Sequence, residues 1–118
     1  MNQITVQGNV GNDPEIKFVK DNLALATFSL AYTPRTQKNG RWEDGETMWF
    51  KIAQFGDKAE AVVDLVKKGD SVIVIGALKQ VSYKARDGQE KQGLEINASH
   101  ISVVPKLNKR KEADLPTW

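Results

Sequence analysis

Only one stretch of this chain, residues 57–66, has the apolar spacing of a helix, and it lies among segments that alternate as strands do. Its apolar stripe is formed by Val62, Leu65 and Val66. Asp57 and Glu60 have the spacing of an N-terminal capping box, in which two side chains satisfy free backbone N–H groups. A chain with a single short helix must build its core from a sheet, so we expect an all-β fold.

Five strand-like segments surround this helix. We expect them at residues 3–19 with a bend over residues 8–14, and then at residues 23–32, 47–55, 71–83 and 94–104. The fourth segment contains Gly76, and the apolar phase of the fifth changes near Ser99-His100. These features predict a sharp bend and a β-bulge, which help a sheet to close into a barrel. Five strands with one helix between the third and the fourth is the element order of an OB-fold, a five-stranded Greek-key barrel.

Two connections carry hairpin signals. Residues 34–46 are mostly polar, with Asn39-Gly40 at the expected tip, which predicts a long mobile hairpin. Long ordered loops in compact domains are often functional. Asp87-Gly88 predicts a tight turn between the fourth and fifth strands.

The third strand-like segment would present two different faces. One face consists of Met48, Phe50 and Ile52, and the other of Trp49, Lys51, Ala53 and Phe55. The first set is typical of a core. Two large rings flanking a lysine are typical of nucleic-acid binding, where rings stack on bases and the cation meets phosphate. The alternative is a strand that is buried on both faces.

The charge is uneven along the chain. Residues 1–105 contain 13 Lys and Arg against 13 Asp and Glu, so the net charge of +2 belongs to residues 106–118. Any nucleic-acid surface on the body must therefore come from segregated charge rather than excess charge. This change in composition predicts a domain at residues 1–104 and a flexible basic tail at residues 105–118.

Several function classes find no support in the sequence. There is no cysteine and one histidine, His100, which excludes disulfides and the usual zinc ligand sets. The acidic residues are scattered, and no glycine-rich loop leads from a strand into a helix to hold phosphate. We therefore predict no enzyme activity, no metal and no cofactor. Without a long apolar run or a secretory signal, we expect a cytoplasmic, nucleoid-associated protein with no membrane partner.

The chain resembles the bacterial single-stranded DNA-binding protein family from Ile4 to about Val103. The resemblance rests on V-Q-G-N-V-G-N-D-P-E (6–15), F-S-L-A (28–31), W-F-K-I-A-Q-F-G-D-K-A-E (49–60), K-K-G-D-S-V-I-V-I-G-A-L-K (67–79) and Y-K-A-R-D-G-Q-E (83–90). Together, in this order and spacing, these segments are a specific match. The loop T-P-R followed by G-R-W-E-D-G-E is more similar to actinobacterial members than to enterobacterial ones.

The resemblance implies a homotetramer of OB barrels that wraps single-stranded DNA. The base-stacking aromatic positions of the family fall at Trp49, Phe55 and Tyr83. The basic residues that we expect along the phosphate path are Lys17, Arg35, Lys51, Lys79, Lys84 and Arg86. A further family tryptophan would fall near Thr36 and is absent. Trp42 either replaces it in stacking or packs against the base of the loop.

The end of the chain departs from the family pattern. Members usually carry a long Gly/Pro/Gln-rich linker and an acidic tip that recruits replication and repair proteins, and no such linker is found here. Asp114, Leu115, Pro116 and Trp118 resemble the tip, but four basic residues lie just upstream. The segment is either a reduced partner-recruiting tip or a basic end that adds phosphate contacts.

The sequence thus predicts a non-enzymatic protein that binds single-stranded DNA without strong sequence preference and protects it during replication, recombination and repair. Two alternatives use the same aromatic and basic strands. One is an RNA-binding or primosome-adaptor OB module. The other is a specialised paralogue that serves a plasmid or natural transformation.

Overall fold

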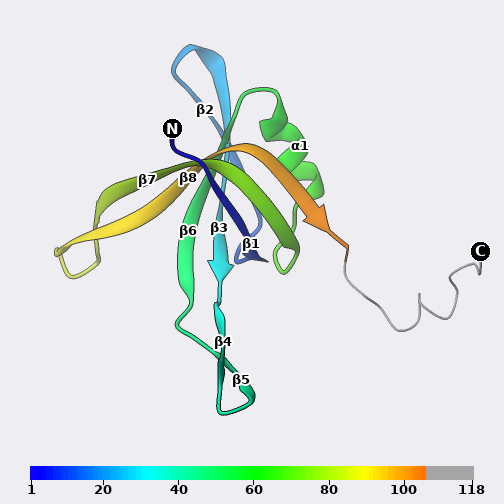
Figure 1. Ribbon diagram of the computed structural model, residues 1–118. Coiled ribbons are helices and arrows are strands. Elements are labelled where there is room, and N and C mark those ends of the chain that lie inside the picture. The colour runs from blue at the N-terminus through cyan, green and yellow to red at the C-terminus, as the bar shows by residue number, and fades with distance from the viewer. Residues whose placement is uncertain (106–118) are drawn as a thin grey trace, which may run out of the picture.

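The computed structural model describes residues 1–105, in which a strongly curved sheet carries one helix at its side (Figure 1). The strands are β1 (Ile4–Val10), β2 (Glu15–Val19), β3 (Leu23–Tyr32), β4 (Arg35–Lys38), β5 (Arg41–Asp44), β6 (Met48–Phe55), β7 (Ser71–Lys84) and β8 (Glu90–Val104). The helix α1 (Lys58–Leu65) connects β6 to β7, and the 3-10 turn η1 (Lys20–Asn22) connects β2 to β3. Within these residues no helix is both long and apolar enough to cross a membrane.

The sheet closes into a barrel of five strands when β1 and β2 are counted as one bent strand. The order in the sheet is β1-β7-β8-β6-β3-β2, and a further pairing between β1 and β3 completes the ring. β1 and β2 are the two halves of the first predicted strand, because both pair with β3 on either side of a bend. β6 and β8 run parallel, whereas β1, β3 and β7 join their neighbours antiparallel. This confirms the predicted OB-fold, with α1 between its third and fourth strands.

The predicted bend and bulge lie opposite each other in β7 and β8. Ile75 pairs with His100 and Gly76 pairs with Ala98, so Ser99 is the extra residue of a β-bulge. The Ser99 hydroxyl donates a hydrogen bond to the Ile75 carbonyl oxygen at 3.1 Å. A Cβ atom at position 76 would collide with the Asn97 carbonyl oxygen. Glycine therefore allows the two strands to approach closely where the barrel turns.

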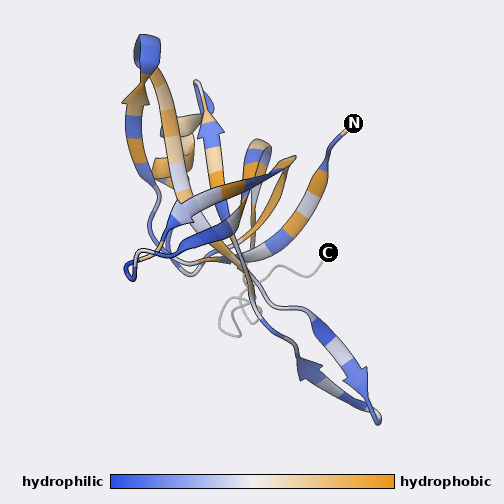
Figure 2. Cartoon of the chain, turned by 90° about the vertical axis from the view of Figure 1, so that its left-hand side faces the viewer, coloured by the Kyte–Doolittle hydropathy of each residue, from blue (hydrophilic) through white to orange (hydrophobic). Residues whose placement is uncertain are grey.

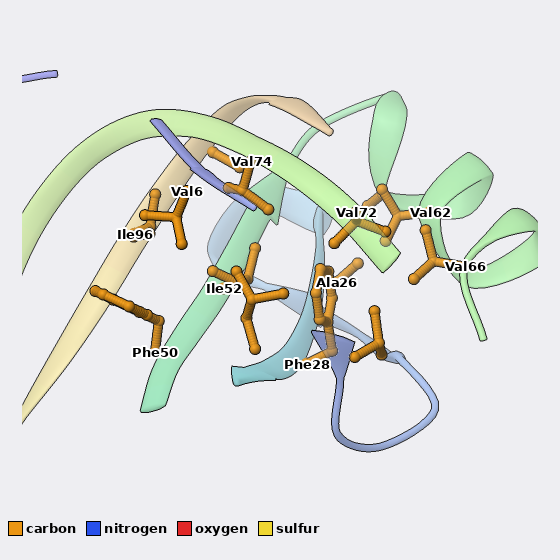
Figure 3. Close-up of a cluster of buried hydrophobic side chains, with 14 residues drawn as sticks. Val6, Ala26, Phe28, Phe50, Ile52, Val62, Val66, Val72, Val74 and Ile96 are labelled. Atoms are coloured by element: carbon orange, nitrogen blue, oxygen red, sulfur yellow. The ribbon is translucent and has the colours of Figure 1, made fainter. Parts of the chain in front are cut away.

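The core fills the barrel and continues beneath α1 (Figure 3). Its largest fully buried side chains are Leu30, Ile52, Val72, Val74 and Ile96. Phe50 is 3% exposed, which confirms the core face of β6 at Phe50 and Ile52. Met48 differs from the prediction, because it is 42% exposed. It lies at the first residue of β6, opposite Tyr32, where the sheet leaves the barrel toward β4 and β5.

The helix matches its predicted position, but its N-terminus differs from the expected capping box. Asp57 has helical backbone angles and makes no side-chain capping hydrogen bond. A capping side chain needs an extended backbone to reach back to the first turn, and Asp57 lacks it. The Gly56 carbonyl instead accepts a hydrogen bond from the Ala59 N–H at 3.0 Å.

The predicted hairpin over residues 34–46 forms a separate two-stranded sheet of β4 and β5. Asn39 and Gly40 at its tip have positive φ angles of 51° and 76°, which suit a two-residue turn. The hairpin extends away from the barrel and is largely hydrophilic (Figure 2). It therefore forms a polar arm rather than part of the core.

Candidate nucleic-acid interface

One face of the barrel sheet gathers several of the predicted site residues. Lys51 on β6 lies opposite Glu95 on β8, and Glu95 lies opposite Lys79 on β7. Opposed residues of paired strands point to the same face, and so do residues two apart on one strand. Lys51, Glu95 and Lys79 therefore form a row across three strands. Trp49 lies two residues before Lys51 and Tyr83 lies four residues after Lys79, so both aromatic residues are on the same face as this row.

Trp49 from β6 and Tyr83 from β7 line one groove of about 450 Å³, together with Lys51 and Glu95. The two aromatic residues are 57% and 52% exposed. This exposure rules out the alternative in which β6 is buried on both faces at Trp49. The groove thus offers two ring faces and a cation to a ligand.

Each of these rings lies against a glycine. A Cβ atom at position 11 would approach Cζ3 of Trp49 to 2.8 Å, and a Cβ atom at position 93 would approach Cε1 of Tyr83 to 3.2 Å. The first distance is shorter than ordinary carbon contacts, and the second is tight. Gly11 is itself fixed by a 2.8 Å hydrogen bond from its N–H to the Ser29 carbonyl oxygen. The glycines therefore set where the rings lie.

The two rings stand on supports of different kinds. Trp49 lies in the barrel wall, where β6 pairs with β3 at Ala31. Tyr83 lies on an arm of β7 and β8 that projects from the barrel (Figure 1). Among the described residues, 81–84 and 90–93 pair only with each other, since the pairing of β8 with β6 begins at Leu94. One side of the groove is thus part of the closed barrel and the other is a two-stranded ribbon.

Phe55 lies at the far end of β6 on the same sheet face. It is 39% exposed and opposes Leu25 of β3, which in turn opposes Lys17 of β2. Phe55 is six residues beyond Trp49, which corresponds to about 20 Å along a strand. Phe55 and Lys17 therefore form a second aromatic and basic position on this face, separate from the groove.

The cations on this face are not equally free. Lys51 Nζ lies 4.0 Å from Glu95 Oε1, and the side chain of Glu95 is 19% exposed against 57% for Lys51. Lys17 and Lys79 are exposed. Glu95 thus offsets the charge of Lys51 within the groove.

Three of the predicted basic residues lie elsewhere. Arg35 is on the β4–β5 hairpin, where it forms a 3.3 Å ion pair with Asp44 and lies 5.9 Å from the centre of the Trp42 ring. Trp42 is 61% exposed, and its ring lies beside Arg35, which pairs with Asp44 at the base of the hairpin. Lys84 has the opposite parity to Tyr83, and Arg86 lies in the turn after β7.

Sequence reasoning missed three residues of this site: Glu95, Gly11 and Gly93. Glu95 is the second residue of the expected fifth strand, and no local signal distinguishes it from an ordinary surface charge. Gly11 fell in the predicted bend over residues 8–14, and the sequence carried no signal that Gly93 would lie against Tyr83. The predicted tail residues Asp114, Leu115, Pro116 and Trp118 lie outside the described residues.

Comparison with known proteins identifies the family. A family model described as the single-strand binding protein family matches residues 1–104. This chain belongs to that family. The result confirms the resemblance found in the sequence.

Several relatives of the family are similar to this chain. The single-stranded DNA-binding protein of Paenarthrobacter aurescens is 38% identical over 100 residues, which cover 83% of this chain and 58% of the relative. The protein of the same name from Corynebacterium glutamicum is 39% identical over 100 residues, covering 83% of this chain and 44% of the relative. The chain thus spans about half the length of these relatives. Both are actinobacterial, as the loop sequence predicted.

Two solved structures share the fold. The small single-stranded DNA-binding protein from Streptomyces coelicolor superposes with a TM-score of 0.78 at 28% identity, covering 86% of this chain and 93% of that chain. The Plasmodium falciparum SSB, solved in complex with single-stranded DNA, gives a TM-score of 0.72 at 26% identity, covering 89% and 96%. Both support the OB-fold assignment.

Proposed function

We propose that this protein binds single-stranded DNA with little dependence on sequence, by stacking bases on aromatic rings and by contacts between phosphates and lysines. One observation carries the proposal: Trp49 and Tyr83 are both more than half exposed in one groove that also contains Lys51. Exposed rings beside a cation bind single strands without reading their sequence. Family membership supports the same function.

Each predicted site residue takes a place in this proposal. Trp49 and Tyr83 stack bases in the groove, and Phe55 stacks a base further along the face. Lys51 contacts a phosphate at the groove that it lines, Lys79 contacts one beside the groove, and Lys17 contacts one beside Phe55. Lys84 and Arg86 extend the path along the β7–β8 arm, and Arg35 extends it onto the β4–β5 hairpin.

Binding to dT oligomers tests the proposal directly. We expect Trp49→Ala and Tyr83→Ala each to weaken binding by about 1–3 kcal/mol, the usual cost of losing a stacked base. Leu65→Ala is a matched control, because Leu65 is 69% exposed on α1, away from the groove. Bound DNA should also quench Trp49 fluorescence. Wild-type affinity in both groove variants, with intact circular dichroism spectra, would rule out the groove as the binding site.

A competition experiment with the wild-type protein distinguishes binding of DNA from binding of RNA. In competition between dT and rU oligomers of equal length, we expect dT to bind more tightly. Tighter binding of rU would favour the RNA-binding module instead.

We further propose that residues 1–104 form the DNA-binding domain and that four copies assemble into a homotetramer. The protein would have no catalytic activity and would protect single strands in replication, recombination and repair in the cytoplasm, at the nucleoid. Light scattering with and without a long dT strand tests the assembly. A monomer at micromolar concentration in both conditions would contradict it.

For residues 105–118 we propose a basic tail whose end, Asp114, Leu115, Pro116 and Trp118, recruits replication or repair proteins. Deletion of residues 113–118 should then remove a protein partner while leaving dT affinity unchanged. If partner binding survives, and dT affinity falls only when Lys109, Arg110 and Lys111 are also removed, the tail acts through phosphate contacts.

A further inference from the structure

Glu95 is an acidic residue in the middle of the proposed DNA path. It lies in the row between Lys51 and Lys79 and lines the groove together with Trp49 and Tyr83. Its side chain is 19% exposed, so its carboxylate is held in the groove rather than moving freely in solvent. An acid at this place calls for an explanation, because the proposed function requires a polyanion to pass over it.

A carboxylate here decides which part of the DNA can lie beside it. Phosphate is repelled by a carboxylate, and the repulsion grows in a partly buried site where the effective dielectric constant is lower. The cation of Lys51, with its Nζ 4.0 Å from Oε1, offsets the repulsion only in part. The part of a nucleotide that fits over Glu95 is therefore the base, which the rings of Trp49 and Tyr83 also favour.

An ionised carboxylate can only accept hydrogen bonds, so it distinguishes bases by their donors. Guanine presents two adjacent donors, N1–H and the N2 amine, which match the two carboxylate oxygens. Cytosine and adenine present one exocyclic amine. Thymine presents a single N3–H between two carbonyl oxygens, which the carboxylate repels.

We propose that Glu95 reads the base held in the groove and gives this sequence-tolerant binder a preference for bases with exocyclic amines, with guanine first. This inference rests on the proposed function. The Glu95 carboxylate accepts the N1–H and N2 amine of guanine, while Trp49 and Tyr83 hold its ring.

The test compares short dT oligomers that carry isolated guanines with the same oligomers carrying hypoxanthine or only thymine. Hypoxanthine keeps N1–H but lacks the N2 amine. For the wild-type protein we expect the guanine oligomer to bind about fivefold or more tightly than dT, the low end for a bidentate base contact, with hypoxanthine between them. In Glu95→Gln and Glu95→Ala this ratio should fall toward one.

Glu90→Gln is the matched control, because Glu90 is an exposed acid on the same strand with the opposite parity. It removes the same charge and should leave the guanine-to-thymine ratio unchanged. Two outcomes overturn the inference: an equal gain in affinity for all three oligomers in Glu95→Gln, or a guanine preference that persists in both Glu95 variants. Failure of wild-type protein to bind any oligomer would instead overturn the proposed function itself.

Discussion

Gly11 lies so close to the indole ring of Trp49 that a Cβ atom at position 11 would come within 2.8 Å of Cζ3. The contact joins the bend between β1 and β2 to an exposed ring on β6. Because the near atom belongs to the end of a side chain, the ring would move more readily than the backbone. The glycine thus controls the position of a ring that we assign to base stacking.

We predict that Gly11→Ala displaces the Trp49 ring and weakens dT binding several-fold, with little change in thermal stability. A double-mutant cycle provides the measurement. In a Trp49→Ala background, adding Gly11→Ala should have no further effect on affinity. Equal losses in both backgrounds would show that Gly11 acts through the fold rather than through the ring.

Phe55 should matter only for longer DNA. It lies about 20 Å from Trp49 along the strand, a span of about six nucleotides at stacked spacing. Phe55→Ala should therefore weaken binding of a 12-nucleotide dT oligomer more than binding of a tetranucleotide. Trp49→Ala should weaken both. The measurement is a titration of each variant with both lengths, and equal losses for Phe55→Ala at both lengths would place the two rings in one site.

The salt dependence should reveal which lysines are already paired. Each phosphate neutralised on a single strand contributes about 0.7 to the log–log slope of affinity against salt. Lys79→Gln should lower the slope by about this amount, whereas Lys51→Gln should lower it less, because Glu95 already offsets Lys51. Titrations between low and moderate salt measure both slopes. A larger effect for Lys51 would show that the pair opens when DNA binds.

Gly76→Ala should destabilise the barrel by about 2 kcal/mol or more, because the added methyl group meets the backbone of β8. Urea unfolding followed by circular dichroism gives the free energy. Gly88→Ala is the control, since Gly88 has a φ of 81° and open space around its Cβ position. It should cost only about 1 kcal/mol of backbone strain. If the two substitutions cost the same, the close approach at Gly76 is relieved by a small shift of β8.

The sequence was sufficient for features that depend on local patterns. The change of apolar phase from Leu94 and Ile96 to Ile101 and Val103 predicted the bulge, which the structure places at Ser99. Alternation along β6 assigned Trp49 and Phe55 to the face away from the core, and both are exposed, whereas Ala53 on the same face is 2% exposed because β6 is buried on both faces there. These features follow from the period of a strand, which each segment carries by itself.

Features that depend on pairing between distant segments could not be predicted in this way. Lys51 and Glu95 lie next to each other because β6 pairs in parallel with β8. The register of this pairing is set by closure of the barrel. Met48 was expected in the core because it alternates with Phe50 and Ile52. It is exposed because β6 begins at the edge of the barrel.

The ribbon that carries Tyr83 has a mechanical consequence. A two-stranded ribbon twists more easily than a strand held on both sides, whereas Trp49 stands in a closed wall. The groove therefore has one wall that is fixed in the closed barrel and a second wall that stands on the more easily deformed ribbon. We expect the Tyr83 side of the groove to move more readily than the Trp49 side, so that the width of the groove adjusts to the ligand that enters it.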